Sequence, residues 1–306
     1  LSNIFGIFCG SSGTISTSNA GGADFANISI LGNHISKSRN GIFARGTTAS
    51  QMTNFIVSDN IIGSDNPDEY VLEYGIYNGY ADAPQVIGNE IYNMIFDVSK
   101  WPIYFVANIN NAVVSRNDIH SIKQPGTTGY NSTGIYFSSA TNCTNNRIDN
   151  NMIYDLSTYG NTSMYLYGIR IAGGSNYKIY YNSVSINDTL GNQNANLPSA
   201  CLYISAAATN IDIRNNIFVN TRVGNSPKNY AVHSPATTTF QFIDYNDYWT
   251  TEGILGYFGG DIATLTDWKV ATSQDANSIS DDPHFISNMD LHINPSFSVV
   301  CDMGTP

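Results

Sequence analysis

Charged side chains of both signs recur at two equivalent positions in the second half of the chain, two and four residues before a repeated Asn. The candidate catalytic residues among them are Asp149, Lys178, Asp212, Arg214 and Asp244. A basic side chain can take a proton from a substrate carbon while carboxylates hold a calcium ion beside it. Two carboxylates at a controlled separation can instead hydrolyse a glycosidic bond. Either chemistry requires these residues to meet on one face.

The same charges also fit a structural role. Lys178 and Asp212 occupy the same position in consecutive repeats, as do Arg214 and Asp244. Opposite charges on neighbouring strands form surface ion pairs that contribute little energy and mainly fix the register. We therefore predict a ladder of ion pairs, with no catalytic residue and no metal or cofactor. The alternative is an active site on this face, with calcium as its ion.

Aromatic residues mark a second candidate surface. They follow a Gly-Ile pair in segments such as Gly75-Ile76-Tyr77, in which the second position is always Ile, Leu or Val. If that residue faces inward, the alternation of a strand sends the next one outward. The candidate binding residues are Phe43, Tyr77, Tyr104, Tyr136, Arg170 and Tyr203. Strands about 4.8 Å apart would align them in an exposed strip suited to sugar rings or a protein partner. The alternative is mutual stacking under nearby loops.

The elements that position these residues follow from an internal repeat. An Asn recurs at intervals of 27 to 34 residues, with an aliphatic residue three positions before it and an apolar residue two positions after it. The repeated residues are Asn33, Asn60, Asn89, Asn117, Asn151, Asn182, Asn216 and Asn246. A period in this range, kept over most of the chain, predicts a repeat architecture.

The repeat has the pattern of strands rather than helices. Apolar residues alternate along short segments, as in Ile28 and Ile30, and β-branched residues dominate. Such segments separated by polar turns are typical of strands. An Asn at a turn can satisfy backbone groups, adopt a left-handed conformation and stack into an amide ladder. We predict an all-β protein, a right-handed parallel β-helix of about eight coils, one for each repeated Asn.

The recurring N-x-I and G-I-Y segments resemble the generic repeats of the right-handed parallel β-helix proteins of the pectate-lyase-like superfamily. The resemblance covers roughly residues 1–249. It implies the fold but no single activity, because the superfamily includes lyases, hydrolases, tailspikes and inert stalks. In a polysaccharide lyase of this kind, Lys178 or Arg214 would be the base, and the aspartates of the same face would hold calcium.

The period breaks near residue 250. The segment from Ile262 to Ala271 has apolar residues at helical spacing, with Thr264 or Thr266 able to cap a helix. An uncovered last coil would expose its core and its strand edges. We therefore predict that residues 250–306 form a capping segment that continues the solenoid of residues 1–249.

Cysteine and histidine spacing gives no sign of a metal site. The four cysteines are Cys9, Cys143, Cys201 and Cys301. They are widely separated, so we predict buried free thiols, with a disulfide involving Cys301 as the alternative. His284 and His292 are expected to pack within the capping segment, with a metal site as the alternative.

Composition indicates the setting. The chain has 306 residues, a net charge of -11 and only 12% charged residues. A negative surface disfavours nucleic acid and anionic membranes as partners. No apolar stretch is long enough to predict membrane insertion. The sequence begins within a coil pattern and without an initiator Met, so we expect a segment of a longer secreted bacterial protein.

Fold, composition and the two surfaces together predict a non-catalytic structural or adhesive module, located outside the cell or on the bacterial cell surface. Its expected partners are other domains or copies of the parent protein, and cell-surface glycan bound through the aromatic strip. The alternative is a polysaccharide-degrading enzyme, a lyase or a glycoside hydrolase, with its chemistry on the face that carries Lys178 and Asp212.

Overall fold

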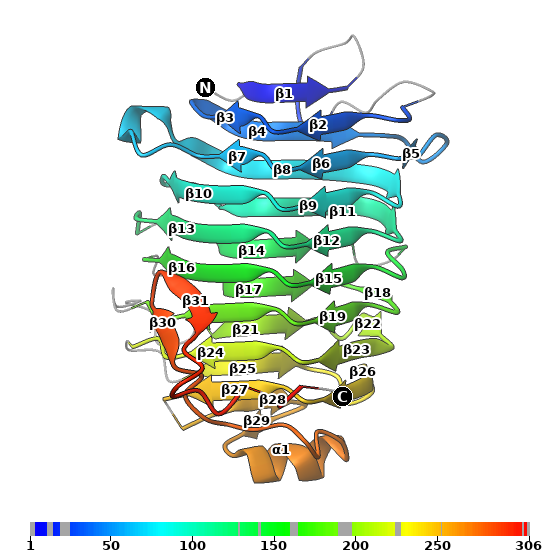
Figure 1. The fold of residues 1–306 in the computed structure, drawn as a ribbon. Coiled ribbons are helices and arrows are strands. Elements are labelled where there is room, and N and C mark those ends of the chain that lie inside the picture. Colours follow the sequence, from blue (N-terminus) through cyan, green and yellow to red (C-terminus); the bar gives the residue numbers. More distant parts are fainter. Residues whose placement is uncertain are drawn as a thin grey trace.

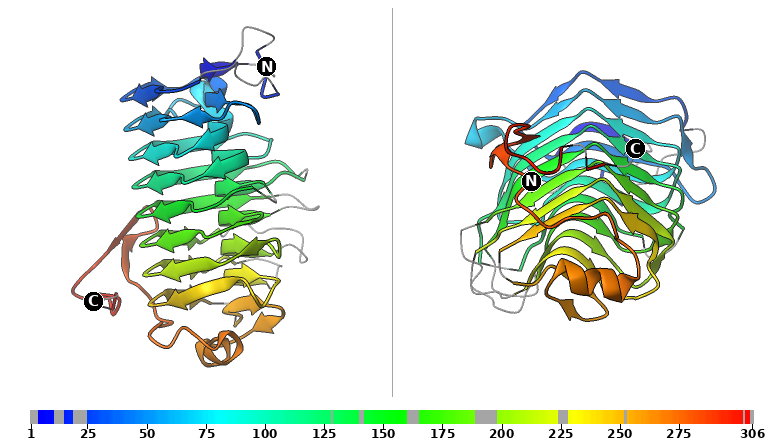
Figure 2. Two further views of the ribbon diagram at one scale, coloured as in Figure 1. Left: turned by 90° about the vertical axis from the view of Figure 1, so that its right-hand side faces the viewer. Right: turned by 60° about the horizontal axis from the view of Figure 1, so that its bottom comes forward.

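Three long sheets, stacked coil upon coil, make up most of the molecule (Figure 1). The computed structural model describes residues 4–10, 15–18, 25–127, 129–139, 142–159, 165–188, 198–223, 228–251, 253–301 and 303–304. Within the three sheets, neighbouring strands come from successive coils and run parallel, apart from one antiparallel strand at an end. Figure 2 shows the coils as layers along one axis. The predicted all-β parallel solenoid is confirmed.

Each sheet carries one of the recurring sequence patterns. Sheet A holds the aromatic segments in β1 (Phe5–Cys9), β4 (Ser38–Arg45), β8 (Val71–Asp82), β11 (Trp101–Asn110), β14 (Ser132–Phe137), β17 (Leu166–Ile171), β21 (Ser199–Ile204), β25 (Asn229–Ser234), β28 (Gly256–Phe258) and β29 (Asp261–Ile262), with β5 (Met52–Thr53) beside β8. Sheet B holds the charged positions in β2 (Ser29–Leu31), β6 (Ile56–Ser58), β9 (Gln85–Ile87), β12 (Val113–Ser115), β15 (Arg147–Asp149), β19 (Lys178–Tyr180), β23 (Ile211–Arg214) and β26 (Phe240–Asp244).

Sheet C follows the repeated Asn and completes each coil. Its strands are β3 (His34–Ile35), β7 (Ile61–Ile62), β10 (Glu90–Ile95), β13 (Asp118–Gln124), β16 (Met152–Thr158), β20 (Ser183–Ile186), β24 (Ile217–Asn220) and β27 (Asp247–Thr250). Smaller elements are the pair β18 (Gly174–Ser175) and β22 (Ala208–Thr209), and the 3-10 helix η1 (Pro67–Glu69).

In-register stacking places equivalent residues of successive coils side by side. On sheet A, Ile76 pairs with Ile103, and Ile103 pairs with Ile135. The eight strands of sheet C span about seven turns from the first strand to the last, which agrees with the predicted number within one coil. The right-handed sense of the winding stays a prediction.

A continuous apolar core fills the space between the three sheets. Ile76 of sheet A, Val86 of sheet B and Ile91 of sheet C are all fully buried within it. Burying each such side chain contributes about 1.5–3 kcal/mol. Gly75 also faces this core, because a Cβ built on it would lie 3.0 Å from Cγ2 of Ile91. The column of glycines therefore marks where sheets A and C approach too closely for a side chain.

Helix α1 (Leu265–Thr272) lies across one end of the stack (Figure 2). Thr264 is its N-cap, and the threonine hydroxyl accepts a hydrogen bond from the backbone N–H of Asp267 at 3.2 Å. This confirms the helix and one of the two caps expected from the sequence. With eight residues α1 is far too short to cross a bilayer, and no helix of the described residues is long and apolar enough to do so.

A final segment, residues 282–293, which we call the strap, folds back beside sheet C (Figure 1). It contains β30 (Phe285–Ser287) and β31 (Asp290–Ile293), which pair with each other in antiparallel fashion. Immediately before the strap, the backbone N–H of Asp281 donates a hydrogen bond to Oδ1 of Asp247 at 3.1 Å. His292 bonds to Asp290 of the strap itself, with 2.6 Å between Nδ1 and Oδ1. The division of the chain at residue 249 stays a prediction.

All four cysteines are free thiols. Cys143 and Cys201 are buried, whereas Cys9 and Cys301 are partly exposed. The alternative of a disulfide through Cys301 was therefore wrong. Burial raises the pKa of the Cys201 thiol well above its usual range, so this side chain behaves as a small apolar group.

Candidate functional site

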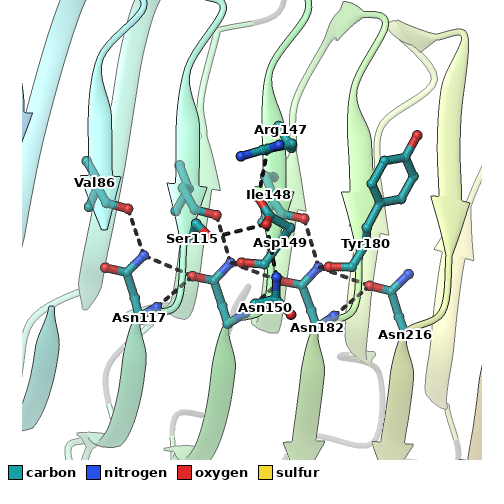
Figure 3. A network of polar contacts seen from close by, with 12 residues as sticks. Val86, Ser115, Asn117, Arg147, Ile148, Asp149, Asn150, Tyr180, Asn182 and Asn216 are labelled. Carbon is teal, nitrogen blue, oxygen red and sulfur yellow. Dashed lines mark hydrogen bonds and ion pairs between the residues drawn. The ribbon is translucent and has the colours of Figure 1, made fainter. Parts of the chain in front are cut away.

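The repeated asparagines form a continuous ladder of side-chain amides (Figure 3). From Asn33 to Asn216, each Nδ2 donates to Oδ1 of the Asn in the following coil, ending at Asn246, at 2.9 to 3.0 Å. The same Oδ1 accepts the backbone N–H of the preceding Asn, as between Asn117 and Asn151. At the last rung, Asn246 donates its backbone N–H to the hydroxyl of Ser278 at 2.8 Å. Buried amides are thereby satisfied along the whole stack.

The left-handed residue of this turn is not the Asn but the residue before it. The eight preceding residues, all with φ between 54° and 66°, are Gly32, Asp59, Gly88, Arg116, Asn150, Tyr181, Asn215 and Tyr245. The ladder Asn, although it tolerates this conformation, is therefore not the left-handed residue of the turn. A second turn, three residues before the aliphatic position, does place asparagines there, as at Asn54 and Asn210.

The predicted catalytic residues lie on one face of sheet B, and the ion pairs of Asp149 and Asp212 are formed within their own strands. Asp212 is bonded to Arg214 at 2.6 Å, and Asp149 to Arg147 at 3.0 Å. Residues two apart on a strand point the same way, so the arginine reaches the near carboxylate without crossing to the next coil. Lys178 is exposed and takes part in none of the ion pairs found among the described residues.

The predicted lateral pairs are therefore not formed, although the predicted register is present. Lys178 is aligned with Asp212, and Arg214 with Asp244, in neighbouring strands. Asp244 is instead held by Asn277, which donates both its backbone N–H and its side-chain amide at 2.7 and 2.8 Å. The ladder of ion pairs is thus replaced by pairs within single strands and by hydrogen bonds to other groups.

Arg214 is the centre of the most closely packed part of this face. Its guanidinium lies over the rings of Tyr180 and Phe242, at 5.2 and 4.9 Å from their centroids. The hydroxyl of Tyr180 donates to Asp212 at 2.6 Å. Burial and the hydrogen bond to Asp212 together raise the pKa of Tyr180 to about 12. The bond to Asp212 also raises the pKa of Arg214. The Tyr180 hydroxyl and the Arg214 guanidinium are therefore both engaged with the carboxylate of Asp212.

The aromatic strip of sheet A is present, but it is more deeply buried than predicted. Phe43 is 0% exposed and Tyr77 is 6% exposed, which corrects the expectation of exposed rings at these two positions. The other predicted strip residues, Tyr104, Tyr136, Arg170 and Tyr203, are half-buried. Successive rings contact each other. Phe43 and Tyr77 are stacked with centroids 4.8 Å apart, whereas Tyr104 and Tyr136 meet edge to face at 5.4 Å. Arg170 takes the place of one ring, 4.5 Å from the centroid of Tyr136.

A second aromatic row, missed in the sequence, runs beside the first. It lies three residues earlier in the coil and includes Tyr74, Trp101, Tyr167 and Tyr230. Tyr74 contacts Tyr77 of the same coil and Trp101 of the next, with centroids 5.2 and 5.0 Å apart. Because Gly75 and Ile76 both face the core, the residue before the glycine returns to the outer face. Strict alternation could not predict this.

A third group on the outer face of sheet C was also missed. The ring of His120 stacks between those of Tyr92 and Tyr154, at 5.4 and 5.1 Å. Glu90 lies 3.6 Å from Nε2 of His120, and Asp118 pairs with Glu90 in the register of the sheet. Burial raises the pKa of the Asp118 carboxyl. These residues could have been found from their position in the repeat, because each follows the repeated Asn by one or three residues.

No group of three or more His, Cys, Asp or Glu side chains among the described residues is placed to hold a metal ion. The candidate surfaces are thus a face of paired charges on sheet B, an aromatic strip on sheet A and a polar group on sheet C. Comparison of the chain with models of protein families, with curated proteins and with solved structures gave no significant match.

Proposed function

We propose that the chain is a rigid, non-catalytic module of a larger bacterial protein, located at the cell surface or outside the cell. The observation that carries this proposal is the pairing of the charged face of sheet B. There, Arg214 is bonded to Asp212 and covered by Tyr180 and Phe242, so the groups that a lyase needs are occupied by each other. Among the residues that the structure describes, no carboxylate is bonded to the amine of Lys178.

Adhesion through the half-buried part of the aromatic strip is the second part of this proposal. Tyr104, Tyr136, Arg170 and Tyr203 offer ring edges, hydroxyls and one cation along consecutive coils. Aromatic side chains with a polar tip suit both sugar rings and protein surfaces. The rigid stack holds these groups at fixed intervals, so a repetitive ligand such as a cell-surface glycan would meet several of them at once.

One observation favours an enzyme as the second candidate. Glu90 and Asp118 are carboxylates in equivalent positions of adjacent coils, with His120 beside them. Pairs of carboxylates in which one has a raised pKa can hydrolyse glycosidic bonds. A polysaccharide-degrading activity would therefore more readily use this group than the face of Lys178 and Asp212.

A screen of the purified chain against soluble polysaccharides tests both candidates. Binding and release of reducing or unsaturated sugars are scored together, with and without calcium. We expect binding without product release, weakened at least tenfold in a variant with Tyr104→Ala and Tyr136→Ala. Tyr80→Ala, in sheet A but outside the strip, is the matched control. Product release that is lost in Glu90→Gln or Asp118→Asn would establish the enzyme instead.

A further inference from the structure

The strap and the outer face of sheet C enclose a groove that none of the predicted surfaces includes. Its volume is about 300 Å³. The floor consists of Ser185, Val219 and Trp249, which are aligned in three consecutive coils. The facing wall belongs to the strap, and Figure 1 shows β30 and β31 folded back at this side of the stack. This volume lies at the lower end of the range for small-ligand sites.

Trp249 differs from the other two tryptophans of the chain. Trp101 stacks on Tyr74 at 5.0 Å, and Trp268 is 0% exposed and packs against Tyr248. Trp249, by contrast, is partly exposed, and no aromatic ring among the described residues stacks on it. Its indole N–H has no hydrogen-bond partner in the part of the chain that the structure describes. Trp249 therefore lines the groove with a ring on which no other described ring is stacked.

Polar side chains converge around this ring. Thr221 adds a hydroxyl at the edge of the floor, and the strap adds Asp282, His284 and Asn288. Asp282 and His284 are both about half exposed, with 4.0 Å between Oδ1 and Nδ1, so their polar atoms remain accessible. Hydroxyls, a carboxylate, an imidazole and an amide supply donors and acceptors in several directions. Such a set can bond the vicinal hydroxyls of a sugar ring.

The charge of the groove limits the kind of sugar. Asp282 is part of its lining and the adjoining Asp281 is also acidic, while the whole chain carries a net charge of -11. A uronate or sulfate group would be repelled at this place. The CH face of a neutral pyranose, however, fits against an indole ring while its hydroxyls reach the polar wall.

We propose that this groove binds one or two residues of a neutral glycan, with Trp249 as the platform and Asp282 as the main hydrogen-bond acceptor. The proposal deepens the adhesive function proposed above and rests on it, but it places the sugar at the strap rather than on the aromatic strip. Because one wall is the strap, a bound sugar also links the strap to sheet C and holds it in place.

Intrinsic fluorescence and calorimetry of the intact chain test this groove. The probes are cellotetraose, xylotetraose, mannotetraose and chitotetraose, with tetragalacturonate as the acidic probe. We expect saturable binding of at least one neutral tetrasaccharide, with a change in tryptophan emission and slower hydrogen exchange in the strap. Trp249→Ala and Asp282→Asn should each weaken that binding at least tenfold, while Trp249→Phe should weaken it less and remove the emission change.

The outcomes separate the groove from the proposed function. Binding that survives Trp249→Ala and is lost in the Tyr104→Ala and Tyr136→Ala variant overturns the groove and leaves the adhesive strip in place. Absence of binding by all four neutral probes, or preference for tetragalacturonate, also overturns it. The thermal unfolding of each variant is measured alongside, and Asp282→Asn, at an exposed position, keeps the test valid if a Trp249 variant fails to fold.

Discussion

The residue before each ladder asparagine has a backbone conformation that suits glycine, although six of these eight residues carry a side chain. A side chain in the left-handed region places Cβ close to the following carbonyl oxygen, at a cost of about 1–2 kcal/mol. Gly32 and Gly88 avoid this cost, whereas Tyr181 and Tyr245 have φ values of 56° and 59°. The ladder, which is satisfied only if this turn is made, holds the tyrosines in the unfavourable conformation.

This conformation predicts opposite changes in the free energy of unfolding for two substitutions. Tyr181→Gly should raise the free energy of unfolding by about 0.5–1 kcal/mol, because relief of the clash exceeds the added chain entropy of glycine. Gly32→Ala should lower it by about 1 kcal/mol, although its Cβ would meet no atom within 4 Å. Denaturant unfolding of both variants gives the two differences. Shifts of the same sign would contradict the explanation.

Asn151 should be among the most sensitive positions of the ladder. Its Oδ1 accepts two bonds from Asn117, and its own amide donates to Asn182. Asn151→Ala leaves buried donors of Asn117 without a partner, so we expect a loss of about 3 kcal/mol in unfolding free energy. Asn33→Ala at the partly exposed start of the ladder is the matched control, with a loss of about 1 kcal/mol. Equal losses for the two variants would show that a position inside the ladder contributes no more to the unfolding free energy than a position at its start.

Sequence reasoning found the ladder but not its turn. The asparagines stand out because one residue type recurs with apolar neighbours at fixed offsets. The left-handed position is occupied by Gly, Asp, Arg, Asn and Tyr, and no composition marks it. The charged face shows the same limit: Lys178 and Asp212 are aligned as predicted, yet bonding is decided by side-chain reach within a strand, which spacing between repeats does not reveal.

At the scale of elements, the packing of α1 against the last coils involves Trp268. The side chain of Trp268, a residue of α1, is fully buried, and its indole N–H donates to the buried carboxylate of Asp275. Trp268→Ala should cost about 3–5 kcal/mol, and it should speed hydrogen exchange first in β27 and β28. Val270→Ala on the same helix, at a residue 75% exposed, should change the unfolding free energy by less than about 0.5 kcal/mol. A comparable loss for both would contradict the packing role.

Asp247 in β27 should make the free energy of unfolding of the molecule depend on pH. Burial, with Asp281 and Asp282 nearby, raises the pKa of Asp247 to about 7, whereas an aspartate in the unfolded chain ionises near pH 4. Between these values the folded state binds the additional proton, so its stability falls as pH rises from about 4 to 7. Asp247→Asn should remove this part of the decline and be relatively more stable at pH 8. Thermal unfolding measured against pH shows the difference, with Asp68→Asn, at an exposed aspartate away from β27, as the control.

Strand prediction was correct where alternation holds and wrong where it is interrupted. The rows of Ile on sheets B and C follow from a period of two. On sheet A the core-facing pair Gly75 and Ile76 breaks that period, which hid the row containing Tyr74 and Trp101. The groove at Trp249 also lay beyond prediction, because the strap that forms its wall has no periodic relation to the coils.

For the whole molecule, the coils and the strap should be separable. The continuous core runs from the first coil to Trp268 and includes no residue of the strap among those described. A chain ending at residue 281 should therefore keep the circular dichroism of the full chain and unfold within a few degrees of it. The same truncation should abolish any binding in the groove at Trp249. A truncated chain that does not fold would show that the strap is part of the core structure.

The overall architecture was the most predictable property. A period near 30 residues, polar turns and β-branched alternation allow few folds other than a stacked solenoid, and each repeat adds independent support. Function is less predictable, because the same coil can carry any set of outward side chains. His120 and Glu90, for example, meet only because two coils are in register.

The direction of the amide ladder bears on how the chain is made. From Asn33 to Asn216, the backbone N–H and one hydrogen of Nδ2 are donated toward the later coil. The acceptor lies 27 residues downstream for Asn33 and 34 residues downstream for Asn182. The ribosome releases the N-terminal coils first. A newly emerged coil therefore waits for the next one before its amides are satisfied, and folding during synthesis runs one coil behind translation until the hydroxyl of Ser278 accepts the final bond.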